Sequence, residues 1–315
     1  METRVEKLLL TSWVTRNSAL AVHVTRAMRT KQWIKNAVCL APLIFSGTFL
    51  DVSSVLAAFL GMFLFSCLAS AIYIINDIYD VELDRLHPTK RDRPIASGAL
   101  PIGIAAVAAI VLAVGSIGMS LLSLGISHAL MLGLYAMLNL IYSGGLKHMA
   151  IADVISIALG FLLRVEAGAI AVAVLPSDWL FICMFFLALL VGFAKRRGEM
   201  VTAQHGGGDQ RPVLSHYSLP FVDLALGMTA AITIISYTLY LVLAHQTQFF
   251  IMTLIPVTFA ILRYLQLVLV NSLGDKPEDI LTTDTQILIA VGIWGVLSAV
   301  SVYLEVWSRG CPPPC

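Results

Sequence analysis

The chain has 315 residues, of which 58% are hydrophobic and only 12% are charged, and its mean hydropathy is +0.87. Soluble domains rarely reach such values, so the composition excludes an ordinary soluble enzyme and predicts a multi-spanning membrane protein with no nucleic-acid partner. The formal net charge of +1 carries little information, because the distribution of charge along the chain matters more.

The two ends of the chain differ from its apolar middle. Residues 1–30 are polar with apolar interruptions, and the basic stretch Val14–Met28 predicts an amphipathic helix that lies at the membrane surface. The tail, residues 308–315, contains three prolines between Cys311 and Cys315 and is expected to be disordered. Whether these two cysteines pair stays open.

Between these ends, nine apolar segments are close to the roughly 20 residues that a helix needs to cross a bilayer. They cover residues 34–50, 54–76, 101–123, 127–143, 151–173, 179–195, 221–243, 248–266 and 286–306. We therefore predict an all-α polytopic membrane protein, in which nine transmembrane helices form one domain (31–307). Cys39, Cys67 and Cys183 lie in apolar runs and are expected to be small core residues.

The basic residues are distributed unevenly over the gaps between these segments. If the N-terminus is cytoplasmic, 18 of the 20 Lys and Arg precede or open the first span or lie in or beside cytoplasmic gaps, and only Arg309 lies outside. This bias is the positive-inside signal of membrane proteins. It predicts that the second, fourth and sixth spans all end at the cytoplasmic face.

The second span ends in a dense cluster of charges that begins at Asn76. Asp77, Asp80 and Asp84 are spaced i, i+3, i+7, so on a continuous helix their carboxylates share one face. Three aligned acids beside an apolar run would repel one another without a cation. Because Mg²⁺ prefers carboxylate oxygens together with substrate phosphates, the cluster predicts a magnesium site that handles a diphosphate. Glu82 points to another side of the helix and is expected to be peripheral.

Polar and basic residues surround this cluster at the same predicted face. Arginine forks and lysine ammonium groups are typical of phosphate recognition, but the positive-inside rule or interfacial anchoring also explains them. Arg29 and Arg93 belong to these basic stretches. The residues that we select as substrate-binding are Lys31, Lys35 and Asn36 near the first span, Lys90 and Arg91 after the second, Tyr142 and Lys147 after the fourth, and Lys195 and Arg196 at the end of the sixth.

The fifth span carries charged residues inside an apolar segment. A lone arginine in a bilayer is energetically unfavourable, so we expect Arg164 to line a cavity, with a structural pair as the alternative. Asp153 lies 11 residues earlier on the same predicted face, roughly 16 Å away. It is expected to hold metal or sugar hydroxyls, or to interact favourably with the N-terminus of its own helix.

These motifs together resemble the UbiA-type intramembrane prenyltransferase superfamily, whose members carry NDxxDxxxD at the end of the second span. The chain departs from the aromatic prenyltransferases at the end of the sixth span, where Lys195-Arg196-Arg197-Gly198-Glu199 replaces a second acidic motif. Over roughly residues 25–300 it is similar to the decaprenyl-phosphate phosphoribosyltransferase subfamily. The stretches that carry this similarity are Lys31–Asn36, His87–Gly98, Tyr142–Lys147, Gly160–Arg164 and Lys195–Arg197.

The resemblance implies a fold, a reaction and a set of residue roles. It implies that residues 31–307 are a catalytic domain, a UbiA-like bundle of nine helices around a central cavity. The bundle would lie in the bacterial inner membrane, with an Mg²⁺-dependent active site facing the cytoplasm. The implied reaction transfers 5-phosphoribose from 5-phosphoribosyl 1-diphosphate to a polyprenyl phosphate, giving a precursor of cell-envelope glycans. Asn76 and the three aspartates of the motif would hold Mg²⁺ and the donor diphosphate. Lys90, Arg91, Lys147, Lys195 and Arg196 would bind the 5-phosphate or the lipid phosphate. The predicted catalytic residues are Asp77, Asp80, Asp84, Lys147 and Arg164.

Two other functions stay open at this point. A prenyltransferase that acts on an aromatic or other small acceptor is the first, and the missing second acidic motif argues against it. A transporter is the second; it would need polar residues at mid-membrane on several helices, where only Arg164 and Glu166 stand out. The sequence leaves the polyprenyl chain length and the oligomeric state open, with a homo-oligomer as one option.

Overall fold

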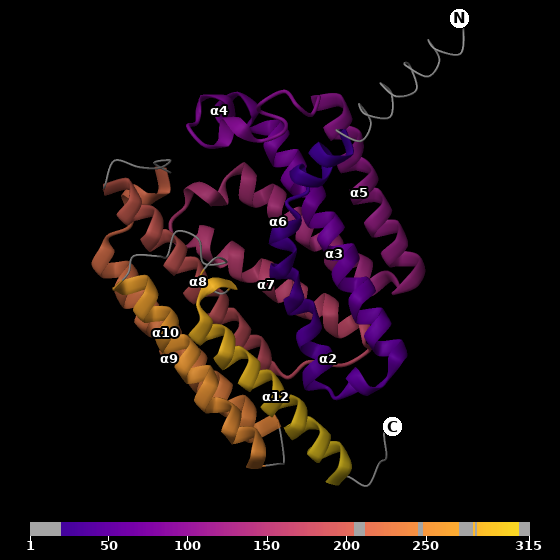
Figure 1. Cartoon of the computed structure of the whole chain (residues 1–315), viewed down its shortest axis with the longest axis vertical. Coiled ribbons are helices and arrows are strands. Elements are labelled where there is room, and N and C mark those ends of the chain that lie inside the picture. Colours follow the sequence, from indigo (N-terminus) through magenta and orange to yellow (C-terminus); the bar gives the residue numbers. More distant parts are fainter. Residues whose placement is uncertain (1–19, 205–211, 245–247, 271–279, 281, 309–315) are drawn as a thin grey trace, which may run out of the picture.

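The computed structural model describes residues 20–204, 212–244, 248–270, 280 and 282–308, and within them all regular structure is helical (Figure 1). Eight helical segments of the described chain are long and apolar enough to cross a membrane. They correspond to the second to ninth predicted spans. Their bounds are α3 (Val52–Tyr79), α5 (Ile102–Ser123), α6 (Ile126–Gly144), α7 (Ala152–Ala171), α8 (Asp178–Gln204), α9 (Leu219–Ala244), η6 (Gln248–Thr253) with α10 (Leu254–Leu269), and α12 (Thr285–Ser308).

The first predicted span, residues 34–50, does not form a regular α-helix. It is divided among the 3₁₀ helix η1 (Thr30–Leu40), the short α2 (Ala41–Phe45) and the 3₁₀ turn η2 (Thr48–Leu50). A 3₁₀ helix rises about 2.0 Å per residue, so η1 and α2 together extend about 30 Å, close to the thickness of the hydrocarbon core. The segment is thus long enough to cross the bilayer, although most of it is a 3₁₀ helix. The predicted number of nine transmembrane helices is therefore approximate.

η1 packs against both α3 and α7. A β-carbon on Gly168 of α7 would lie 1.9 Å from the carbonyl oxygen of Cys39 in η1, so this approach requires glycine. Small residues serve the same purpose in other membrane bundles, where close packing replaces the hydrophobic driving force. As predicted, Cys39, Cys67 and Cys183 are buried.

α7 joins two halves of the bundle. Towards one half, its Ala167 belongs to a core with Phe65 of α3 and Leu132 of α6. Towards the other, Val154 and Ala158 pack in a core built mainly by α8, α9 and α10. Figure 1 shows this division, with α3, α5 and α6 on one side and α9, α10 and α12 on the other. Contacts of α7 with α3 and α6 on one side, and with α8 on the other, therefore connect the two halves.

Short elements cap one end of the bundle. α4 (Val81–Leu86) and η3 (Lys90–Asp92) follow α3, η4 (Leu146–His148) follows α6, and η5 (Pro212–His216) precedes α9. Residues 20–27 of the predicted interfacial segment are helical, and Ala27 packs with Ile74 of α3 and Ile95. Residues 1–19 and 309–315, including Cys311 and Cys315, lie outside the described residues.

Candidate functional site

The acidic motif extends over two helices instead of following one. Asp77 lies on α3 and Asp84 on α4, and Asp80 stands at the break between them, with φ −91° and ψ 9°. Asp77 and Asp84 are both buried, each 4% exposed. Nη1 of Arg93 lies 3.0 Å from Oδ1 of Asp77 and 2.6 Å from Oδ2 of Asp84. One guanidinium group therefore joins the first and last acids of the motif.

A second arginine reaches the same carboxylate from the N-terminal side. Nη2 of Arg29 lies 2.5 Å from Oδ1 of Asp77, and its guanidinium carbon lies 5.0 Å from the ring centre of Tyr73. The backbone of Arg29 has φ 52°, which is uncommon for a residue other than glycine. The sequence places Arg29 and Arg93 among basic residues that could contact phosphate, but it does not select them as site residues. Their contact with Asp77, which lies 48 and 16 positions away, becomes visible only in the fold. The only sequence signal for these two arginines is that each lies in a stretch rich in basic residues.

The residues of the motif fit a small divalent cation. Oxygens of Asp77 and Asp84 converge on one positively charged group, and carboxylate oxygens are the ligands that Mg²⁺ prefers. Asn76 contributes an amide oxygen at the same end of α3, and Asp80 is partly exposed beside it. Among the described residues, no group of three acidic, histidine or cysteine side chains is already gathered around one point. Instead, Asp77 pairs with both arginines and Asp84 pairs with Arg93.

The end of α6 contacts the acidic motif directly. The hydroxyl of Ser143 donates a hydrogen bond of 3.3 Å to the amide oxygen of Asn76. Tyr142 precedes this contact and Lys147 follows it in η4, and both are partly buried. The structure thus brings the ends of the second and fourth predicted spans together.

Five further basic residues of the prediction lie on three different helices. Lys31 and Arg91 are exposed, and Lys35, Lys90 and Lys195 are partly buried. Lys31 and Lys35 lie on η1, Lys90 and Arg91 on η3, and Lys195 on α8. The roles of these five side chains in binding stay predictions.

Arg196 and Asp153 form an ion pair in the interior. Nε of Arg196 lies 2.8 Å from Oδ2 of Asp153, and both side chains are almost completely buried. Glu199, one turn further along α8, pairs with Nη1 of the same guanidinium. Oδ1 of Asp153 accepts a hydrogen bond of 2.7 Å from the hydroxyl of Tyr217. Because the side chain of Arg196 is 1% exposed, against 30% for Arg93, this geometry favours a structural role for Arg196 and Asp153 over the predicted contact with substrate.

Arg164 is buried at a deeper level of the bundle. Its Nε donates to Oδ1 of Asn36 at 2.7 Å, and Nη2 donates to the hydroxyl of Tyr135 at 2.9 Å. Its guanidinium carbon also lies 5.1 Å from the ring centre of Phe65. Asn36 in turn donates a hydrogen bond to Ser66 of α3, which lies 11 residues before Asp77. Eleven residues of an α-helix span roughly 16 Å, so Arg164 lies at about that depth below Asp77. Phe65 and Tyr135, whose rings contact this guanidinium, both belong to a hydrophobic core cluster, which favours the structural interpretation of Arg164.

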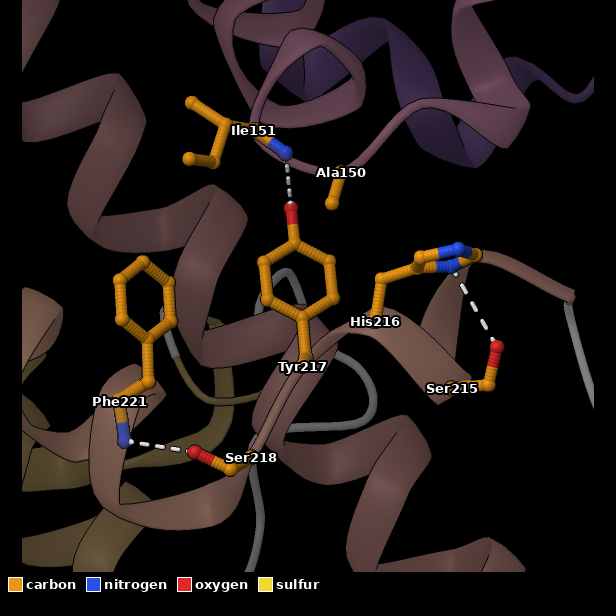
Figure 2. A pocket seen from close by; sticks show the side chains of 7 residues that line it. All are labelled: Ala150, Ile151, Ser215, His216, Tyr217, Ser218 and Phe221. Atoms are coloured by element: carbon orange, nitrogen blue, oxygen red, sulfur yellow. Dashed lines mark hydrogen bonds between the residues drawn. The ribbon is translucent and has the colours of Figure 1, made fainter.

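A pocket of about 450 Å³ lies between the α6–α7 loop and the start of α9 (Figure 2). In Figure 2 the hydroxyl of Tyr217 points towards the backbone nitrogen of Ile151, from which it accepts a hydrogen bond of 2.6 Å. Burial raises the pKa of Tyr217, and its bond to Asp153 raises it further, so the hydroxyl keeps its proton. The lining residues are Ala150, Ile151, Ser215, His216, Tyr217, Ser218 and Phe221.

Comparison with known proteins agrees with this architecture. Residues 37–278 match the UbiA prenyltransferase family. The chain belongs to that family. The predicted family and its helical membrane fold are thereby confirmed.

Several UbiA-family relatives are similar along nearly the whole chain. The decaprenyl-phosphate phosphoribosyltransferase of Corynebacterium glutamicum is 33% identical, over 90% of this chain and 88% of its own length. The enzyme of the same name from Mycolicibacterium smegmatis is 34% identical, over 91% of this chain and 94% of its own length. A solved UbiA homolog from Archaeoglobus fulgidus, bound to GPP and Mg²⁺, superimposes with a TM-score of 0.66 at 17% identity, covering 92% of this chain and all of that one. At that identity the structural likeness supports the fold alone.

Proposed function

We propose that this UbiA-family chain transfers 5-phosphoribose from 5-phosphoribosyl 1-diphosphate to a decaprenyl-type polyprenyl phosphate and releases pyrophosphate. The observation that carries the proposal is the meeting of two buried carboxylates, Asp77 and Asp84, with the guanidinium groups of Arg29 and Arg93. A site of mixed charge can bind a cation and a polyanion together. The names of the similar proteins from Corynebacterium and Mycolicibacterium support the choice of donor and acceptor.

The acidic motif would hold the divalent cation, for which we propose Mg²⁺. Asp77 and Asp84 would be its ligands, and Asp80 and the amide oxygen of Asn76 would be further oxygen donors. When bound, the cation neutralises negative charge on the departing diphosphate. The hydrogen bond from Ser143 to Asn76 keeps the amide of that residue oriented at the end of α3.

The two arginines would bind the diphosphate of the donor. Each already contacts Asp77, so both guanidinium groups lie where the acids and the polyanion must meet. Arginine presents several N–H donors in a planar fork that matches phosphate oxygens. We propose that Lys31, Lys35, Lys90, Arg91, Tyr142, Lys147 and Lys195 complete the binding surface for the 5-phosphate and for the phosphate of the lipid.

In the reaction, an oxygen of the lipid phosphate attacks C1 of the ribose. The bond between C1 and the diphosphate oxygen breaks, and its electron pair leaves with pyrophosphate. No strong general base is required, because the attacking phosphate is already anionic. The contribution of the chain is therefore to position the two substrates and to stabilise the charge of the leaving group.

The distribution of charge supports an inner-membrane protein whose site faces the cytoplasm, where a soluble sugar diphosphate is available. Eighteen of the 20 Lys and Arg are on that side in the predicted orientation. The apolar chain of the acceptor would lie among the lipid-facing helices while its phosphate meets the polar end of α3.

The test is a transfer assay in membranes that contain the protein. Labelled 5-phosphoribosyl 1-diphosphate, decaprenyl phosphate and Mg²⁺ should give a labelled lipid, and the Asp77→Asn variant should not. A parallel reaction supplies a prenyl diphosphate and an aromatic acid. Prenylation of the acid, without any labelled lipid in the first reaction, would show that the chain is a prenyltransferase and would refute the proposal.

A further inference from the structure

The loop between α6 and α7 is held at both of its ends. At the first, Ser143 donates to Asn76 of the acidic motif, 3.3 Å away. At the second, the backbone nitrogen of Ile151 donates to the hydroxyl of Tyr217, 2.6 Å away. Lys147 lies between these two attachments, in η4. Its position relative to the motif therefore depends on both of them.

The second attachment holds a strained backbone. Ile151 has φ 69° and ψ −48°, although a β-branched residue strongly disfavours positive φ. Such a conformation persists only where the surrounding structure holds it in place. Tyr217 provides that hold from outside the loop, and both residues line the pocket in Figure 2.

The hydroxyl of Tyr217 has one defined orientation. It accepts from the backbone of Ile151 and donates to the carboxylate of Asp153, so its proton must point towards the acid. Asp153 is fixed in turn by Arg196 of α8. The loop is thus attached through one tyrosine to an ion pair that joins α7 and α8.

We infer that Tyr217 is a positioning residue, which fixes Ile151 and thereby places Lys147 for binding of a substrate phosphate. Asp153 and Arg196 act one step further away, by orienting the hydroxyl. Tyr217 itself touches no reacting atom in this scheme. The inference rests on the proposed function, because that function assigns the phosphate to Lys147.

The kinetic test is the coupling between Tyr217→Phe and Lys147→Gln. Tyr217→Phe keeps the ring and removes the hydroxyl, and we expect KM for 5-phosphoribosyl 1-diphosphate to rise about tenfold with a smaller change in kcat. In a Lys147→Gln background the same substitution should add little. If the two losses multiply in the double variant, Tyr217 does not act through Lys147 and the inference is overturned.

Tyr237→Phe is the matched control. It removes a hydroxyl from another buried tyrosine, whose partners Thr253 and Trp294 belong to a different part of the bundle. We expect the KM of Tyr237→Phe for 5-phosphoribosyl 1-diphosphate to match that of the unchanged protein. A rise in KM equal to that of Tyr217→Phe would overturn the inference. If Tyr217→Phe fails to fold, Asp153→Asn is used in its place. Its effect on KM should likewise be small when it is added to Lys147→Gln.

A labelling experiment separates this inference from the proposed function. Lys147→Cys is introduced into a chain whose Cys311 and Cys315 are replaced by Ser, and a charged maleimide reports the accessibility of position 147. We expect Tyr217→Phe to raise the labelling rate several-fold, and an unchanged rate would overturn the positioning role. Because this readout needs no substrate, it holds even if the transfer assay fails.

Discussion

Asp77 and Asp84 belong to different helices, yet the same nitrogen of Arg93 contacts a carboxylate oxygen of each. The break at Asp80 brings them together, because it lets α4 turn relative to α3 while both acids stay buried. Their burial beside arginines distinguishes them from Glu82, which is exposed and pairs with Arg85.

The substitution Asp84→Asn should abolish transfer while the protein stays folded. It removes one anionic ligand of the proposed cation site, so we expect activity to fall by roughly 100-fold or more. The measurement is the rate of labelled lipid formation over a range of Mg²⁺ concentrations. Glu82→Gln, a loss of one carboxylate from the same helix, is the control and should retain activity. Equal losses in both variants would contradict the assignment.

Arg93→Gln and Arg29→Gln should weaken binding of the donor. Each removes a guanidinium that contacts Asp77, and a charge-assisted hydrogen bond contributes roughly 1.5–3 kcal/mol, so KM for the donor should rise at least tenfold. Steady-state kinetics against 5-phosphoribosyl 1-diphosphate provide the measurement. Arg26→Gln changes an exposed arginine three residues before Arg29 and should leave KM unaltered. An unchanged KM in the two site variants would remove both arginines from the proposed site.

Arg164→Met should reduce stability more than catalysis. The change leaves the buried oxygens of Asn36 and Tyr135 without their donor, which costs about 1–3 kcal/mol for each group. We expect a lower unfolding temperature in detergent, while the folded fraction keeps its KM for the donor. If kcat falls and the unfolding temperature does not, Arg164 has the catalytic role that the sequence predicts.

Gly168→Ala should displace η1 from α7. The new methyl group would overlap the carbonyl of Cys39, and overpacking of this kind costs about 1–3 kcal/mol or more. Gly115→Ala on α5 is a matched control, because a β-carbon there meets no atom within 4 Å. Thermal unfolding of the two variants gives the comparison. A Gly168→Ala protein as stable as the control would show that η1 does not pack as described.

The sequence predicts features that depend on local pattern and misses those that depend on contact. Long apolar runs predict nine spans because hydropathy reports burial in lipid, and eight of the nine correspond to long apolar helices of the described chain. The same property cannot distinguish a 3₁₀ from an α-helix, so η1 was not foreseen. The acids of the motif are visible in the spacing of Asp77, Asp80 and Asp84. The arginines that contact them, and the hydroxyl of Tyr217 beside Asp153, come from distant positions that only the fold brings near.

The 3₁₀ geometry of η1 sets a fixed length between two anchored points. Asn36 is tied to Arg164 within the bundle, and Arg29 is tied to Asp77 at its polar end. Seven residues of η1, from Thr30 to Asn36, connect these anchors. Rewinding them into an α-helix would bring the anchors about 3.5 Å closer together, which is more than the hydrogen bonds can accommodate. Deleting or inserting one residue between these anchors would have a similar effect. The number of residues in this stretch is therefore as constrained as their identity.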